Sequence, residues 1–219
     1  MRLRIAAAVA VAFGLVTAGC TDTNDPGTEG PLVSGSPSIG VSSMTFDEAY
    51  HQVPVDGVGD LKINWDVPSE ADVDDVLAAR RALTHVYWGS QATDWTPITA
   101  TARFLFTEEY YQRVLAGLGT SGAGDPMIGP IWVKFMGVEN LGLDQTRVTF
   151  CTDIGWWHEA SDSTPQVRED RANLESFVMR NVPTGDGEQH WLADQHWNPD
   201  ADRRAKYGAE CTEWAQHKP

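Results

Sequence analysis

Apolar positions in the first half of the chain recur with the period of a helix. Ser69 is expected to cap a long helix that ends near Trp88, and acidic residues follow the cap, which suits the positive end of a helix. The positions on the inward face of this helix are Val73, Val76, Leu77, Arg80, Leu83, Thr84 and Tyr87. Thr107 is the expected cap of a second helix. The apolar face of that helix consists of Tyr111, Val114, Leu115 and Leu118.

After residue 126 the period changes to alternation, which predicts strands. The predicted strands are 131–136, 147–154, 174–182 and 190–197, with a hairpin turn at 183–187. Within 147–154, Val148 and Phe150 share one face while Cys151 and Asp153 share the other. Shorter elements are predicted at 44–50 (helical turns), 61–65 (strand) and 201–206 (helix).

Helices that come first, followed by strands linked by hairpins, indicate an α+β domain. We expect N-terminal helices to pack on an antiparallel sheet of about four strands. The chain has 219 residues, and removing a leader and a tether leaves roughly 175, the size of one ordinary domain.

The first twenty residues have the pattern of an export signal. A short basic start is followed by twelve apolar residues, 5–16, which are too few to span a bilayer as a helix, since that takes about 20. The following Thr-Ala-Gly-Cys ends at Cys20 and resembles the lipobox of bacterial lipoproteins, although Thr17 stands where that family usually has Leu. The resemblance implies that Cys20 is acylated and anchors the chain at the extracytoplasmic face of a cell membrane.

The segment after Cys20 is rich in small and polar residues and predicts a flexible tether. The expected organisation is a signal peptide (1–19), the acylated cysteine with its tether (20–45), a linker or extended segment (46–68) and the α+β domain (69–219).

Composition limits the classes of partner. The formal net charge is −15, and without the two arginines of the signal, 14 basic residues face 31 acidic ones, so the exported chain carries −17. Such a charge disfavours nucleic acids and anionic lipids, which are polyanions. We expect a solvated acidic surface.

Three cysteines are present, and Cys20 is assigned to the lipid. Cys151 and Cys211 remain as a pair in an oxidising compartment, which predicts a disulfide. The alternative, a nucleophilic thiol with a histidine base, lacks a family signature around either cysteine.

The order of elements resembles the NTF2-like superfamily, the cystatin-like α+β cone, and more narrowly actinobacterial secreted proteins and lipoproteins of unassigned function. The resemblance covers residues 70–211. It rests on 79–83 with Tyr87, on Gly129, on 148–153 with its Cys-x-Asp ending, on Trp191-Leu192 and on Cys211. It implies a curved sheet wrapped around the long helix. Some members are isomerases, dehydratases or cyclases with an Asp or His in the cone, and others bind ligands or partners, so the fold does not select a function.

Two groups of residues are candidates for chemistry within such a cone. Asp153 is a candidate general base if burial raises its pKa, and the alternative is a structural carboxylate paired with Arg147 or another neighbour. Trp156 and Trp157 should point to opposite faces, with His158, a second catalytic candidate, on the side of Trp156. The candidates for lining a ligand pocket are Trp132, Trp156, Trp157, Trp191 and Trp197, and the alternative is that they pack in the core or at an exposed edge.

Alternation places His190, Asp194 and His196 on one strand face, opposite Trp191 and Trp197. The two histidines would lie about 20 Å apart along the strand, which is too far for one ion, so no metal site is expected. No dinucleotide, zinc-protease, redox or serine-hydrolase motif occurs, and no cofactor is predicted.

These patterns favour a non-catalytic, membrane-anchored protein that binds a small apolar ligand or an envelope protein. One alternative is an isomerase or dehydratase that uses a pocket Asp or His. Another is a structural subunit of an envelope complex, which predicts an exposed apolar patch on the sheet.

Overall fold

The computed structural model describes residues 44–197 and 200–219, although the side chain of Trp197 lies outside the description. Every described residue belongs to one compact unit, Ser42–Pro219. Cys20, the expected acylation site, lies outside the described residues. This unit has a hydrophobic core of its own and is a domain in its own right.

Fourteen helical and strand elements make up the described part of the chain. In chain order they are α1 (Phe46–Gln52), β1 (Ile63–Asp66), η1 (Ser69–Ala71), α2 (Asp74–Gln91), α3 (Thr96–Ala102), α4 (Glu108–Tyr110), η2 (Tyr111–Leu115), β2 (Met127–Ile128), β3 (Ile131–Gly142), β4 (Gln145–Asp153), β5 (His158–Glu159), β6 (Ala172–Pro183), β7 (Gln189–Trp197) and α5 (Ala201–Trp214).

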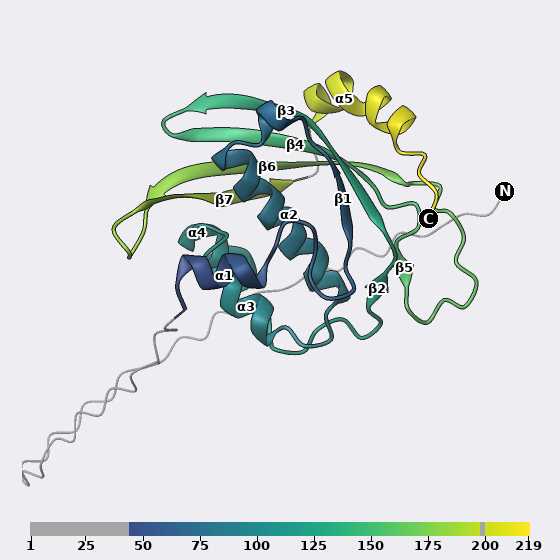
Figure 1. Ribbon diagram of the computed structural model, residues 1–219, viewed down its shortest axis with the longest axis horizontal. Coiled ribbons are helices and arrows are strands. Elements are labelled where there is room, and N and C mark those ends of the chain that lie inside the picture. Colours follow the sequence, from purple (N-terminus) through teal and green to yellow (C-terminus); the bar gives the residue numbers. More distant parts are fainter. Residues whose placement is uncertain (1–43, 198–199) are drawn as a thin grey trace, which may run out of the picture. The chain divides into compact units, whose positions relative to one another are not determined.

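A curled five-stranded sheet, in the order β1-β3-β4-β6-β7, forms a half-barrel around α2 (Figure 1). The last four strands are antiparallel neighbours, and β1 joins the edge of β3 in parallel. The predicted α+β class, with helices on a curved sheet, is confirmed. The sheet has a fifth strand in addition to the four expected ones, because the four-residue β1 pairs with the edge of β3.

The inner, concave side of the sheet is closed by α2. Val148, Phe150 and Phe177 face it and are fully buried, as are Val76 and Leu83 of the helix. Alternation along β4 correctly predicted that Val148 and Phe150 share one face, and the structure shows that this face enters the core.

The outer side of the sheet carries α5 (Figure 1). Cys151 of β4 forms a disulfide with Cys211 of α5, as predicted, and both cysteines are buried. The bond fastens the C-terminal helix to the sheet over a sequence separation of 60 residues. The loop-entropy model assigns such a bond about 4 kcal/mol.

The segment 46–68, expected to be a linker, is part of this folded unit. It supplies α1, whose Thr45 and Glu48 form a capping box, and β1. Leu61 and Ile63 are buried in the same core as α2. Only four strand residues alternate here, so the pattern was too short to separate a strand from an extended linker.

Both predicted helices differ from expectation in their details. The long helix starts at Asp74 after a single turn of 3₁₀ helix, and Val73 precedes it as an exposed residue in place of the expected Ser69 cap. Thr107 caps the second helix as predicted, but this helix continues as a π turn over Tyr111–Leu115. The π turn changes the angular spacing of residues, and Val114 and Leu118 are exposed.

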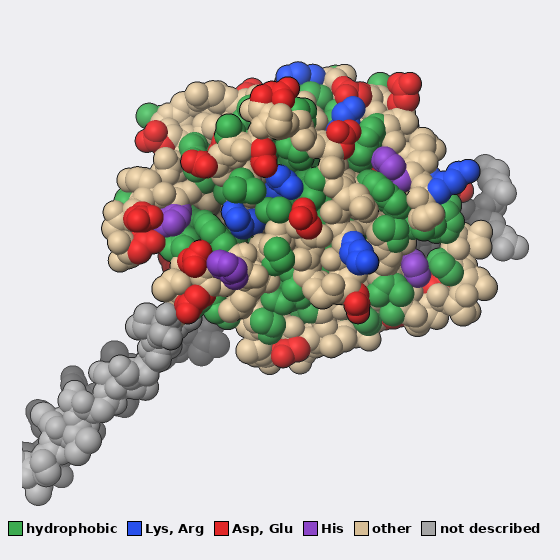
Figure 2. All heavy atoms as spheres, viewed as in Figure 1, with side chains coloured by type: hydrophobic (Ala, Val, Ile, Leu, Met, Phe, Trp, Pro, Cys, Tyr) green, Lys and Arg blue, Asp and Glu red, His purple; other side chains and the backbone are tan. Residues whose placement is uncertain are grey.

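On the face shown in Figure 2, acidic side chains are spread among apolar ones, with a few basic groups between them. Within 44–197 and 200–219, no helix is long and apolar enough to cross a membrane.

Candidate functional site

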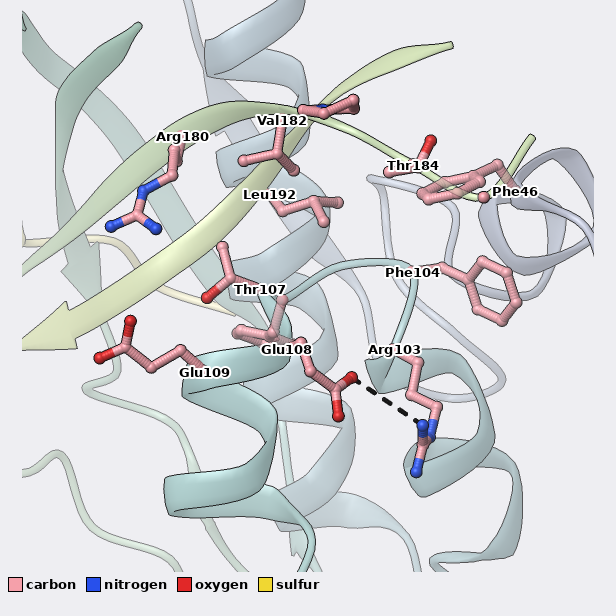
Figure 3. A pocket seen from close by; sticks show the side chains of 13 residues that line it. Phe46, Arg103, Phe104, Thr107, Glu108, Glu109, Arg180, Val182, Thr184 and Leu192 are labelled. Carbon is pink, nitrogen blue, oxygen red and sulfur yellow. Dashed lines mark ion pairs between the residues drawn. The ribbon is translucent and has the colours of Figure 1, made fainter. Parts of the chain in front are cut away.

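An open pocket of about 520 Å³ lies between the β6–β7 hairpin, the start of α1 and the segment that joins α3 to α4. Figure 3 shows Val182, Leu192 and Thr107 near its middle, with Arg180 on one side and Arg103 with Glu108 on the other. Phe46 and Phe104 form a further wall and meet edge to face, with their ring centroids 5.1 Å apart. The volume falls within the range of small-molecule sites, about 300–1,000 Å³.

Backbone pairing with β7 fixes the wall of the pocket that leads into α4. Ala193 donates its N–H to the carbonyl of Leu105 (2.8 Å), and Thr107 donates its N–H to the carbonyl of Ala193 (3.0 Å). The segment thus runs beside β7 as a short parallel addition to the sheet. Arg103 and Glu109, at its two ends, are thereby held at opposite rims of the pocket.

Arg180 is oriented by a buried carboxylate beneath the pocket. Its Nη2 donates to Oδ2 of Asp194 (3.0 Å), and the hydroxyl of Thr107 donates to the other oxygen of Asp194 (2.8 Å). Asp194 is only 6% exposed, so its carboxylate is shielded from solvent. The guanidinium therefore has a fixed position at the pocket wall.

A second polar group lies on the inner side of the sheet. The Glu175 carboxylate accepts hydrogen bonds from the Tyr87 hydroxyl (2.5 Å) and the Thr152 hydroxyl (3.1 Å), and it meets Nε2 of His196 at 3.0 Å. Tyr87, Thr152 and Glu175 are buried, and the His196 side chain is 22% exposed. We refer to Tyr87, Thr152, Glu175 and His196 as the inner cluster.

Protonation in the inner cluster is shifted by burial and by neighbouring groups. Burial alone would raise the pKa of Glu175, but the hydrogen bond and charge of His196, with the two hydroxyls, hold it below its usual value. Burial and the adjacent Glu175 raise the pKa of Tyr87 well above 10.0. A carboxylate beside an imidazole is a general acid–base pair in chemical terms.

The sequence-predicted catalytic candidate, Asp153, lies on the outer side of the sheet and not in the cone. Its carboxylate receives two hydrogen bonds from Arg171 (3.0 and 2.8 Å), one from the N–H of Gly155 and one from the N–H of His217. Burial alone would raise the pKa of Asp153, but these donors hold it below its usual value. A carboxylate kept ionised by a permanent cation is a poor base, so the structural alternative describes it better.

Two of the candidate pocket tryptophans, Trp132 and Trp156, contact His217 near the C-terminus and do not line the open pocket. The ring of Trp132 stacks on the ring of His217, with centroids 5.0 Å apart. The indole N–H of Trp156 donates to the backbone carbonyl oxygen of His217 (3.2 Å). Trp132, Trp156, Asp153 and Arg171 all contact His217 and so hold the C-terminal segment against the sheet. We refer to these five residues as the outer clasp.

The remaining predicted aromatic positions are separate from one another. Trp157 is buried in the core against Tyr87, on the side opposite Trp156, as expected. Trp191 packs partly buried against the same core, and the side chain of Trp197 is outside the described residues. His158 pairs in β5 with β2, and its Nδ1 meets the carbonyl of Trp156 at 2.7 Å.

The prediction that His190, Asp194 and His196 share one face of β7 is wrong. Val178 pairs with Gln195 while the next residue, Met179, pairs with Ala193, so Asp194 is the extra residue of a bulge. An extra residue reverses the alternation beyond it, and His196 therefore faces the inner cluster. His190 stacks on Phe46, with centroids 3.8 Å apart.

Among the described residues, Asp186, Glu188 and His190 are a group whose side-chain ligand atoms lie within 4.8 Å of one another. Asp186 accepts hydrogen bonds from Thr184 and from the N–H of Glu188, and it pairs with His190 at 2.9 Å. These contacts close the β6–β7 turn, which accounts for the arrangement without an ion.

Sequence reasoning missed Glu175, Arg171 and the arginines of the open pocket. Arg103 and Arg180 belong to no motif, and they line the same pocket because one parallel bridge holds the segment before α4 beside β7. Glu175 interrupts the apolar face of β6, and that break in the pattern was the available signal.

We compared the chain with models of protein families, with curated proteins and with solved structures, and none of them matched.

Proposed function

We propose that this protein is a lipid-anchored lipoprotein at the extracytoplasmic face of a cell membrane, and that its cone-like domain binds a small, mostly apolar molecule without transforming it. The observation that carries the binding role is the open pocket beside β7, where Phe46, Phe104, Val182 and Leu192 provide apolar walls. The Cys20 motif supports the anchor, and the disulfide fits an oxidising compartment. The NTF2-like resemblance is compatible with this role.

Native mass spectrometry of residues 42–219, purified from an oxidising compartment, tests the binding role. A retained adduct of a few hundred daltons is expected, and its mass would give the ligand class. Replacing Val182 by Trp should fill the pocket and abolish the adduct. The matched control is Val138→Trp, because Val138 is 49% exposed on β3 and does not line the pocket. An adduct that survives Val182→Trp would remove this pocket from consideration.

The anchor is tested separately in cells. The full chain should fractionate with membranes and incorporate a labelled fatty acid, and Cys20→Ser should lose the label. Persistent labelling of Cys20→Ser would exclude Cys20 as the acylation site.

A second candidate function, an isomerase or dehydratase, is favoured by the inner cluster. Glu175 or His196 would abstract a proton from a bound substrate. The two groups lie 3.0 Å apart, which is close enough for one of them to act as the base while the other is its hydrogen-bond partner. The open pocket is lined by Phe46, Phe104, Val182 and Leu192 and by none of the inner-cluster residues, which favours the binding role for that pocket. Incubating the retained ligand in heavy water separates the two functions. Deuterium uptake at carbon that Glu175→Gln abolishes would indicate catalysis, and no uptake would leave simple binding.

A further inference from the structure

We infer that the ligand of the open pocket is an amphiphile, an oxyanion head group on an apolar body, and that Arg180 binds the head group. This inference rests on the proposed binding function and adds to it the chemical class of the ligand. It follows from how Arg180 is held, which of its donors are used, how the nearby carboxylates are paired, and where the apolar walls lie.

Arg180 is positioned before any ligand arrives. Its Nη2 is held at 3.0 Å by Asp194, which is buried and also bound by Thr107. An arginine fixed from behind by a buried carboxylate loses less side-chain entropy when it binds an anion in front. The side chain is 35% exposed, so part of it remains accessible from the pocket that it lines.

Most of the hydrogen-bonding capacity of Arg180 is unused within the described residues. A guanidinium has five N–H donors. The contact with Asp194 uses one of them and the Nε is buried, so the donors that remain for a ligand are three on the terminal nitrogens Nη1 and Nη2. A planar fork with free donors matches the two oxygens of a carboxylate or the oxygens of a phosphate.

The two glutamates at the rim are each matched by an arginine. Glu108 lies 3.9 Å from Arg103, and Glu109 lies 3.4 Å from Arg113. Both glutamate side chains are about two-thirds exposed, at 67% and 68%. Charges in water are strongly screened, so these carboxylates oppose an anion at Arg180 only weakly.

Apolar surface continues from Arg180 across the pocket. Figure 3 shows Val182 and Leu192 next to Arg180, and Phe46 and Phe104 beyond them. A molecule with its charge at Arg180 would therefore lay an apolar body along this wall. A purely apolar ligand would cover the guanidinium and leave its donors that do not bind Asp194 without partners, which is costly.

The experiment titrates residues 42–219 with three probes of equal chain length: dodecanoate, dodecanol and dodecylammonium. Each is kept below its critical micelle concentration, and binding is followed by calorimetry. Dodecanoate should bind at least about tenfold more tightly than dodecanol. A hydrogen bond to a charged group is stronger than a neutral one by an amount of free energy that corresponds to about tenfold in the dissociation constant. Dodecylammonium should bind more weakly than dodecanol. Equal affinity for dodecanoate and dodecanol would overturn the inference while leaving apolar binding intact, and no binding of any probe would overturn both proposals.

Variants identify the residue. Arg180→Gln should abolish the preference for dodecanoate, and Arg180→Lys should retain a smaller preference because it keeps the charge without the fork. Arg168→Gln is the matched control, since the Arg168 side chain is 37% exposed, close to the 35% of Arg180, and does not line the pocket, so its preference should be unchanged. Thermal unfolding of each variant verifies folding, and Arg180→Lys keeps a cation beside Asp194 if Arg180→Gln unfolds. A preference that persists in both Arg180 variants would contradict the assignment.

Discussion

The domain buries a carboxylate on each side of its sheet, and the two are supported in different ways. Asp153 in the outer clasp is fully buried and bound by Arg171, whose charge is permanent. Glu175 in the inner cluster is 4% exposed and is bound by Tyr87, Thr152 and His196, groups that are neutral or titratable. Burial of a charge is compensated on one side by an opposite charge and on the other mainly by hydrogen bonds.

This difference indicates different roles for the two sides. The outer clasp joins β4, the loop before β6 and the C-terminal tail, and the disulfide lies next to it. The inner cluster joins α2 to β4, β6 and β7 through side chains whose hydrogen-bonding roles depend on protonation. We therefore expect the outer side to resist changes in pH and the inner side to respond to them.

Breaking the outer clasp should have the largest effect. Asp153→Ala removes the carboxylate from Arg171, whose side chain is 14% exposed, and from the N–H of His217. Loss of one partner of a buried ion pair costs about 3–5 kcal/mol. Urea unfolding at pH 7 should show this loss as a lower midpoint with an unchanged slope.

The control for this prediction is Asp170→Ala. Asp170 pairs with Arg168 at 3.1 Å, but its side chain is 78% exposed, so the expected cost is below about 1 kcal/mol. Equal losses in the two variants would show that the clasp contributes no more than a surface pair.

The helical side of the core should show its pH response through His85 of α2. Burial lowers the pKa of His85 from 6.5 to about 4, although its contact with the carbonyl of Ile98 acts in the opposite direction. Because the unfolded chain takes up this proton at higher pH than the folded chain does, stability is complete above about pH 6.5. It falls as the pH drops towards 4. The shift corresponds to about 3 kcal/mol over that window.

Unfolding measured from pH 7 to pH 4 tests this response. His85→Gln keeps a donor for Ile98 but cannot titrate, so its stability should change less across the window. His51→Gln replaces a histidine whose side chain is 79% exposed and should follow the wild-type curve. A wild-type curve that is flat between pH 6.5 and 4 would contradict the burial of a neutral imidazole.

The comparison of the two sides also shows what the sequence could predict. Alternation along β4 placed Phe150 and Cys151 on opposite faces of the strand, and the pairing of Cys151 with Cys211 followed from the number of cysteines and the expected compartment. These features depend on local periodicity and on the number of cysteines. Both can be read without knowing the three-dimensional fold.

The sites could not be predicted in the same way. Asp153 lies two residues after Cys151 and therefore shares its face of β4. Alternation does not tell whether that face lines a cavity or supports a helix. The bulge at Asp194 turned His196 inward, and a single extra residue leaves no signature in the alternation. Arg180 and Arg103 line the same pocket only because the chain before α4 runs beside β7.

The smallest predicted effect concerns Glu175 and completes the contrast. Glu175→Gln keeps an acceptor for Tyr87 and Thr152, so at pH 7 we expect a loss of about 1–2 kcal/mol. The pKa of Glu175 is depressed in the folded state, hence the wild type has this stabilisation above about pH 4.3 and loses it as the pH falls. The difference between wild type and variant should therefore shrink between pH 7 and pH 3.5 in urea unfolding, since Asp153 titrates equally in both chains. Glu109→Gln, at an exposed rim position, should show no such change, and a constant gap between Glu175→Gln and wild type would mean that the inner carboxylate is not ionised in the folded protein.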